Sequence, residues 1–312
     1  MMPEQNQRHP AIGGIPLVLG GNVFGWTAKG DDGLAVLDAF YEAGGRMIDT
    51  ADVYSAWIPG HQGGESETLI GQWLESRGVR KDMLIHTKTG MMGGAELYEP
   101  ARLLRSLDES LERLRTDYLD LYYAHQDFDE LPIEDIVGAF DGAVRTGKVW
   151  ALGASKFTAP RLEAALDAAA RLGAEPFSVL QNQYNLVVRS DFGPDLQCLC
   201  AERGIAMLPF FGLAAGYLTG KYRKPEDFEG AARGYRARDF LAKGPPVLAV
   251  MDAIAAETGA SLPAIALAWL GAQPGIAAPI ASARTPAQLE PMLEALNLVL
   301  DDDRLARLSA AA

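Results

Sequence analysis

Short runs of aliphatic and aromatic residues alternate with longer segments of helical periodicity along the whole chain. The runs predict strands over residues 15–21, 46–50, 83–89, 118–125, 149–156, 177–185, 205–211 and 276–283. The periodic segments predict helices over residues 32–44, 66–77, 97–115, 133–147, 160–172, 193–203, 246–258, 261–273 and 286–297. Eight strand–helix units in series, without a linker or a break in composition, predict a (β/α)8 barrel, with residues 1–312 as a single domain.

The alternative arrangement is a doubly wound open sheet. That fold predicts a glycine-rich turn of the pattern GxGxxG after the first strand. Gly20 and Gly21 stand at this place and do not complete the pattern. The barrel is therefore the favoured prediction.

Two segments are too long to be plain connectors and follow predicted strand ends. Residues 55–65 form the first, and we expect them to provide a wall of a substrate pocket at the mouth of the barrel. Residues 212–245 form the second, which we expect to be irregular. This segment carries basic side chains suited to a flap over a phosphorylated ligand, namely Lys221, Arg223, Lys224, Arg233, Arg236 and Arg238.

The overall charge restricts the possible partners. The net charge is −13, from 28 basic and 41 acidic side chains, so we expect no binding to nucleic acid and no attraction to an anionic membrane. The polar N-terminus and the lack of a long apolar stretch predict a cytoplasmic protein. Cys198 and Cys200 are expected to be two packed, reduced thiols, and no metal site is predicted. No pattern indicates an oligomeric state.

Four polar residues lie at or just beyond the ends of three predicted strands. They are Asp49, Tyr54, Lys88 and His125. Each alone has a structural explanation, such as a turn cap, a buried ion pair or core packing. Together at the carboxyl ends of barrel strands, where catalytic groups collect, they indicate a site. Lys88 can lower the pKa of Tyr54, Asp49 can hold Lys88 charged, and His125 can donate to a carbonyl oxygen.

These residues stand in motifs that resemble the aldo-keto reductase superfamily. The motifs are MIDTADVYS (47–55), GGESETLIGQWL (63–74), HTKTG (86–90) and DYLDLYYAHQ (117–126), and the resemblance extends from about Ile15 to Leu308. It implies hydride transfer between a nicotinamide cofactor and a carbonyl, without metal or flavin. It also implies that Tyr54 is the proton donor, that Lys88 and Asp49 tune it, and that His125 orients the carbonyl.

The resemblance further implies a cofactor site. Lys156 stands where the family has an asparagine that holds the carboxamide, Phe210 replaces a stacking tyrosine, and Pro291 and Met292 replace a Glu-Asn pair near the adenine. Arg284, at a helix start, is the candidate ligand of a 2′-phosphate, so NADPH is favoured and NADH is possible. The implied cofactor residues are Gly21, Asn22, Asp49, Ser155, Lys156, Gln181, Phe210, Phe211, Gly212, Leu213, Ala215, Gly216, Lys221, Ser282, Arg284 and Gln288.

The substrate is predicted only by class. Trp26, Tyr54, Trp57, His125 and Phe128 are expected to line an aromatic, largely apolar pocket. No arginine is obviously placed to bind a carboxylate, so aldehydes and ketones with an apolar or aromatic body are expected, and the direction of reaction is open. The alternatives are a non-catalytic, NADPH-binding regulatory subunit of the same fold, and an aldolase that forms a Schiff base on Lys88.

Overall fold

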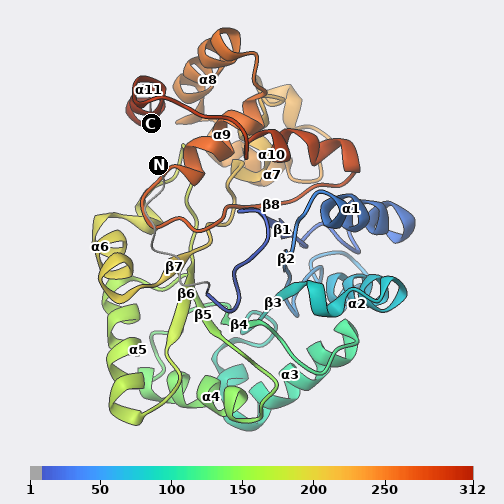
Figure 1. The fold of residues 1–312 in the computed structure, drawn as a ribbon, viewed down its shortest axis with the longest axis vertical. Coiled ribbons are helices and arrows are strands. Elements are labelled where there is room, and N and C mark those ends of the chain that lie inside the picture. The colour runs from blue at the N-terminus through green and yellow to red at the C-terminus, as the bar shows by residue number, and fades with distance from the viewer. Residues whose placement is uncertain (1–8, 312) are drawn as a thin grey trace.

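A computed structural model describes residues 9–311, and its centre is a barrel of eight parallel strands ringed by helices (Figure 1). Neighbouring strands pair in the order β7-β6-β5-β4-β3-β2-β1-β8. The strands are β1 (Val18–Gly20), β2 (Met47–Asp49), β3 (Leu84–Thr89), β4 (Leu121–Ala124), β5 (Leu152–Ser155), β6 (Phe177–Gln181), β7 (Ala206–Met207) and β8 (Ile280–Ala281).

The barrel closes between β7 and the chain that leads into β8. Met207 bridges to Ile276 in parallel, and the amide of Ala277 donates to the carbonyl oxygen of Met207 at 2.9 Å. The amide of Ile280 donates to the carbonyl oxygen of Pro209 at 3.0 Å. Every strand thus has a neighbour on both sides, which confirms the predicted (β/α)8 barrel.

The helices bury one face against the strands. In α3 the leucines at positions 103, 107, 111 and 114 recur at helical spacing and are buried, while Glu99 caps the helix by accepting from the amides of Ala101 and Arg102. The helices are α1 (Gly30–Glu42), α2 (Glu65–Arg77), α3 (Pro100–Leu114), α4 (Ile133–Arg145), α5 (Ala159–Leu172), α6 (Pro194–Arg203), α7 (Gly234–Ala237), α8 (Gly244–Thr258), α9 (Leu262–Gly271), α10 (Glu290–Glu294) and α11 (Asp302–Ala310).

Alternation along the strands decides which side chains enter the barrel. Met47, Leu121, Tyr123, Ala151 and Val179 form an interior cluster that is separate from the layer between strands and helices. A side chain at Gly153 would overlap the ring of Tyr123, so a glycine is needed there. Because side chains alternate with a period of two, residues two positions beyond these also point inward, at the carboxyl ends of the strands.

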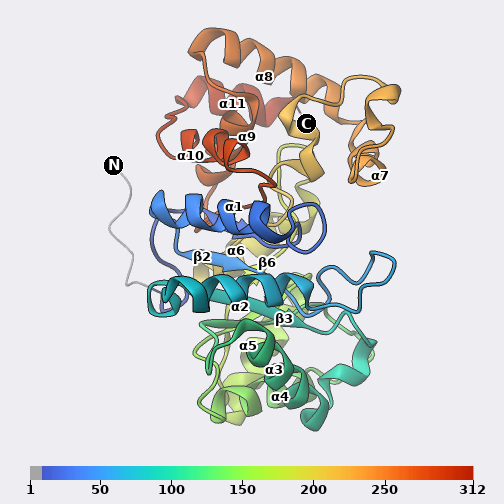
Figure 2. The same cartoon turned by 90° about the vertical axis from the view of Figure 1, so that its right-hand side faces the viewer.

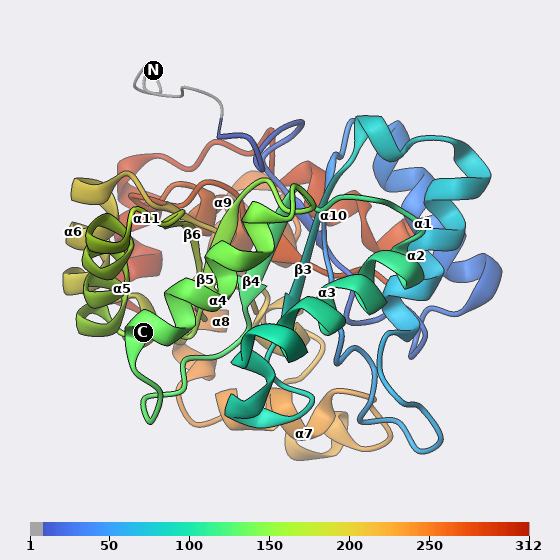
Figure 3. The same ribbon diagram turned by 90° about the horizontal axis from the view of Figure 1, so that it is seen from below.

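The segment before β1 closes the amino end of the barrel. Ala11 is fully buried in the interior cluster, and Nε2 of His86 donates to its carbonyl oxygen at 2.8 Å. Burial lowers the pKa of His86 to about 3, so this imidazole is neutral. The start of the described chain, residues 9–17, lies on one face of the barrel, whereas α7 and the loop after β2 lie on the opposite face (Figures 2 and 3).

Several local predictions differ from the structure. The predicted helix 286–297 is a 3-10 turn (Pro286–Gln288) followed by α10, with a proline in the first turn of each, and α11 was not predicted. The segment 212–245, expected to be irregular, contains α7 and three 3-10 turns, at Ala214–Thr219, Pro225–Phe228 and Arg238–Phe240. Cys200 is buried, but Cys198 is exposed, so the prediction of two packed thiols is wrong for Cys198.

In the described part of the chain no single helix is long and apolar enough to cross a membrane. Only α8 and α9 taken together reach that length and composition, and they are bent by 101°.

Candidate active site

The side chains at the carboxyl ends of β2 and β3 form a buried ion pair. Nζ of Lys88 lies 2.6 Å from Oδ2 of Asp49 and also donates to the carbonyl oxygen of Thr50 at 2.7 Å. Lys88 is fully buried. Burial is the largest single influence and lowers the pKa of Lys88, but the charges and hydrogen bonds of Asp49 and Tyr54 together outweigh it, so this pKa is raised above its ordinary value. Lys88 is therefore a fixed cation at neutral pH.

Tyr54 completes this chain of contacts. Its hydroxyl lies 3.4 Å from Nζ of Lys88, while Nε2 of Gln181 at the end of β6 donates to Oδ1 of Asp49 at 2.8 Å. Burial raises the pKa of Tyr54, and the charge of Lys88 opposes that rise without cancelling it. Lys88 lowers the pKa of Tyr54, as expected, but burial is the larger influence, so the pKa lies above its ordinary value and Tyr54 is protonated at neutral pH.

His125 faces Tyr54 across the mouth. The two ring centroids are 5.9 Å apart and the rings are inclined by 73°. Burial and the charges of Lys88 and Lys156 hold the pKa of His125 well below its ordinary value, so the imidazole is neutral. Its Nδ1 is buried and has no hydrogen-bond partner among the described residues. A neutral imidazole can still donate one N–H to an oxygen in the mouth.

Aromatic side chains continue from Tyr54 towards the surface. Trp57, from the loop after β2, lies 5.8 Å from the Tyr54 ring and 5.6 Å from the ring of Trp26. Trp57 is 43% exposed, so its face is available to a ligand. Phe128, expected in the same wall, instead packs against Tyr98 with the centroids 5.1 Å apart, in the hydrophobic core. Packing accounts for Phe128 better than a pocket role does.

A row of cations lies beside the aromatic wall. Arg233 donates to Oδ1 of Asn22 at 2.6 Å, its guanidinium lies 5.5 Å from the Trp26 ring, and burial lowers its pKa to about 10. Asn22 also accepts from the hydroxyl of Ser282 at 2.9 Å. Burial lowers the pKa of Lys221, and the nearby charges of Arg284 and Arg233 add to this effect. No carboxylate within 4.0 Å pairs with these three cations in the described residues.

The backbone next to this row contains small residues in left-handed conformations. Phe211, Ala214 and Ala215 have positive φ values of 55°, 48° and 54°, and a side chain at Gly216 would come within 3.2 Å of Nζ of Lys221. The amide of Arg284 donates to the side chain of Gln288 at 3.0 Å, which orders the start of the turn at Pro286–Gln288. Small residues and cations without a carboxylate partner among the described residues make this segment suitable for an anion.

Two basic residues do not lie where the sequence placed them. Arg223 donates twice to Asp252, at 2.7 and 2.8 Å, so it is not free to bind a phosphate. The side chain of Lys156 does not enter the barrel: its Nζ reaches Sδ of Met91 at 3.2 Å. Ser155, in contrast, is buried at the end of β5, as expected for an inward-facing residue.

Asp52 carries a second buried carboxyl group, which sequence reasoning missed, and its amide donates to the carbonyl oxygen of Lys88 at 3.2 Å. Burial raises the pKa of Asp52 to about 7; Glu67 adds to the rise, while Thr89 and Arg113 oppose it. Oδ1 of Asp52, the hydroxyl of Thr89 and that of Tyr122 are buried without partners among the described residues.

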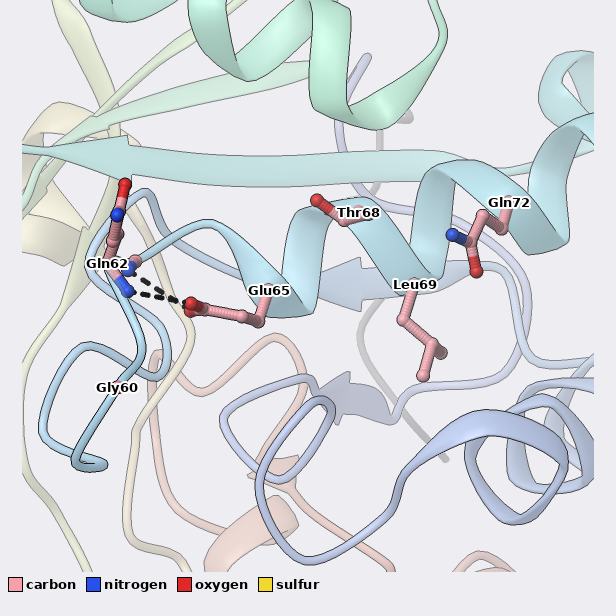
Figure 4. A pocket seen from close by; sticks show the side chains of 7 residues that line it. Gly60, Gln62, Glu65, Thr68, Leu69 and Gln72 are labelled. Carbon is pink, nitrogen blue, oxygen red and sulfur yellow. Dashed lines mark hydrogen bonds between the residues drawn. The ribbon is translucent and has the colours of Figure 1, made fainter.

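One glutamate, Glu65, fixes the loop 55–65 through hydrogen bonds to its backbone amides. Glu65 accepts from the amides of Ser55, Gln62 and Gly63 at 3.2, 2.8 and 3.1 Å. A groove of about 530 Å³ lies outside this loop along α2, lined by Glu65, Thr68, Leu69 and Gln72 among others (Figure 4). None of the four strand-end residues contributes to it. Within residues 9–311 no group of three His, Cys, Asp or Glu side chains could hold a metal ion.

The chain belongs to the aldo/keto reductase family, whose model matches residues 16–312. It is accordingly an NAD(P)H-dependent oxidoreductase of that family. It is 31% identical over 318 residues to norsolorinic acid reductase of Aspergillus flavus, and the aligned region covers 95% of this chain and 77% of the relative. It is 30% identical over 289 residues to aryl-alcohol dehydrogenase [NADP(+)] of Phanerodontia chrysosporium, covering 86% and 73%.

Proposed function

We propose that this protein reduces the carbonyl group of aromatic aldehydes or ketones with NADPH, and that Tyr54 is the general acid. The observation that carries the proposal is the contact chain from Gln181 through Asp49 and Lys88 to the hydroxyl of Tyr54, at the mouth of the barrel. The relatives whose names specify an aryl alcohol and NADP(+) support the aromatic substrate and the cofactor.

The residues of the mouth divide the proton chemistry among them. A substrate carbonyl oxygen held by the N–H of His125 also accepts the hydroxyl proton of Tyr54 as negative charge develops on that oxygen. Lys88, fixed by Asp49, stabilises the phenolate that this transfer leaves on Tyr54. Bound nicotinamide would supply the hydride. In alcohol oxidation the same phenolate takes the proton back.

The raised pKa of Tyr54 is consistent with this role. A protonated phenol is the form required for donation, and its transfer to a developing alkoxide is favourable because an alkoxide is the stronger base. The part of Lys88 is then to lower the energy of the phenolate product, rather than to ionise Tyr54 beforehand.

The cationic row supports NADPH as the cofactor. Lys221, Arg233 and Arg284 are unpaired cations beside amides and small residues, and this donor set fits a pyrophosphate and a 2′-phosphate. We assign Arg233 to this group together with the implied residues Asn22, Ser282 and Gln288, which contact one another or the row. Ser155 and Gln181 stand at adjacent strand ends, where they are available to the nicotinamide amide.

The test is the substitution Tyr54→Phe, which removes the proton and keeps the ring. With 4-nitrobenzaldehyde and NADPH, we expect kcat to fall by about 100-fold to 10,000-fold, the usual range for losing a general acid. The dissociation constant for NADPH, measured by cofactor fluorescence, reports separately whether the site has kept its shape. Full turnover by the variant would show that Tyr54 is not the acid.

The two alternatives predict different results. A non-catalytic regulatory subunit would bind NADPH and reduce no carbonyl compound in a broad panel. A Schiff-base aldolase would form a borohydride-trapped adduct on Lys88, but that ammonium is held charged by Asp49 and Thr50, which disfavours attack on a carbonyl.

A further inference from the structure

The loop 55–65 contains a histidine that takes no part in the strand-end contacts or in the cationic row. Nδ1 of His61 is hydrogen-bonded to Oγ of Ser55 at 3.1 Å, and the same nitrogen lies 3.9 Å from Oε2 of Glu65. Ser55 is fully buried and directly follows Tyr54 in the chain. His61 is therefore joined to a fixed point of the fold, one residue from the proposed acid.

This contact closes a short ring of chain, residues 55–61. Inside the ring the backbone makes two successive turns: the amide of Ile58 donates to the carbonyl oxygen of Ser55 at 3.1 Å, and the amide of His61 donates to that of Ile58 at 3.0 Å. None of the residues 56–61 is buried, so packing against the core does not fix this part of the loop. Among the described residues, the bond to Ser55 is the only side-chain hydrogen bond that residues 56–61 make.

Trp57 lies inside this ring of chain and meets the site only through the edges of aromatic rings. Its ring is inclined by 67° to that of Tyr54 and by 84° to that of Trp26, with centroids 5.8 and 5.6 Å apart. These two contacts leave 43% of Trp57 exposed. An indole that is exposed to this extent keeps one orientation only if the backbone that carries it is held.

The second half of the loop is held independently of His61. Glu65 accepts from the amides of Gln62 and Gly63, and both bonds are drawn in Figure 4. Glu65 also accepts from the amide of Ser55. Loss of the His61 side chain would therefore release residues 56–60, which include Trp57, and would leave the two ends of the loop in place.

From this arrangement we infer that His61 is a positioning residue for the substrate, because it holds the indole of Trp57 beside Tyr54. The inference rests on the proposed reduction of aromatic carbonyl compounds. A substrate ring that extends from the hydroxyl of Tyr54 towards the surface packs on the exposed face of Trp57. A small aliphatic aldehyde lacks this aromatic contact. His61 thus sets the preference for substrates with a ring without touching either reactant.

The test compares 4-nitrobenzaldehyde with propanal at saturating NADPH. His61→Phe keeps a ring and removes the hydrogen bond, so we expect KM for 4-nitrobenzaldehyde to rise about threefold to tenfold, the value of one aromatic contact, at little change in kcat. For propanal, kcat/KM should stay at the wild-type value. Ser55→Ala, which removes the other partner, should give the same pattern.

Two further variants serve as controls. His61→Asn places a polar atom near the position of Nδ1 and should restore the low KM. His9→Phe is the matched control, because Nδ1 of His9 also makes one local hydrogen bond, from the amide of Ala11, at the amino end of the barrel. It should change neither substrate.

A double variant shows whether His61 acts through the indole. Trp57→Ala should raise KM for 4-nitrobenzaldehyde at least as much as His61→Phe does, and the two substitutions together should have no larger effect than Trp57→Ala alone. Effects that multiply, or an equal loss on both aldehydes, would overturn the inference and leave the proposed reaction intact. Absence of turnover of both aldehydes by the wild type would overturn the proposed reaction, and the inference with it.

Discussion

Asp52 makes the stability of this barrel depend on pH in an unusual direction. Its carboxyl group is buried, and burial raises the pKa from 3.8 to about 7. A carboxyl group whose pKa is higher in the folded protein favours folding when protonated. Its contribution is fully present below pH 3.8 and is lost as the pH rises through 7. The shift of about 3 pH units corresponds to about 4 kcal/mol lost above pH 7.

The substitution Asp52→Asn removes the titration and keeps the shape of the side chain. Between pH 5 and pH 8 the wild type loses the part of this contribution that spans two pH units, or about 3 kcal/mol. The free energy of unfolding of the variant, relative to the wild type, should therefore rise by about 3 kcal/mol over that range. Urea unfolding followed by far-UV circular dichroism at pH 5, 6, 7 and 8 measures the difference.

The control for this experiment is Asp117→Asn, because Asp117 is exposed and makes no ion pair within 4.0 Å. This variant loses a carboxylate at the surface, so it controls for the removal of one negative charge. The absolute effect of Asp52→Asn at any one pH includes the fit of the new amide, so the reasoning concerns only the slope. A difference between variant and wild type that stays constant from pH 5 to pH 8 would refute a buried carboxyl with this pKa.

Two further predictions concern the site. Lys88→Met should leave Asp49 buried without its cation and destabilise the fold by about 3–5 kcal/mol in urea unfolding. The double variant that adds Asp49→Leu should recover most of the lost stability but not the activity. Equal stability of the single and the double variant would contradict the buried pair. Arg284→Ala should raise the dissociation constant for NADPH about tenfold and that for NADH far less. Arg223→Ala, whose guanidinium is held by Asp252, is its control in a fluorescence titration, and an equal effect on both cofactors would remove Arg284 from the 2′-phosphate.

The barrel and the strand-end residues could be predicted because both follow from local patterns. Alternation along a strand fixes which side chains point inward, so Asp49, Lys88 and His125 at the ends of β2, β3 and β4 had to meet once the strands were parallel and closed. The motif that contains Tyr54 is contiguous with β2. No long-range information was needed for this part of the site.

The incorrect predictions concern side chains whose direction depends on tertiary packing. Phe128 packs into the core against Tyr98, and Arg223 forms an ion pair with Asp252 of α8. The backbone of Lys156 is left-handed and hydrogen-bonded to Asn182, which directs its side chain over the mouth. Arg233 stood in a recognised basic segment, but no sequence pattern distinguished it from its neighbours. The pKa values of Tyr54 and Asp52 depend on burial, which a linear pattern does not specify.

The closed amino end of the barrel has a kinetic consequence. Because Ala11 and His86 fill that end, every reactant has to enter and leave by the mouth. Arg233 of the cationic row donates to Asn22, while Trp57 packs against Tyr54 and Lys156 reaches Met91. On the proposed assignment, the nucleotide uses the row and the carbonyl compound lies beside Trp57, so both share this one opening. We therefore expect an obligatory order of binding, with the nucleotide first on and last off, and its release as the step that sets turnover.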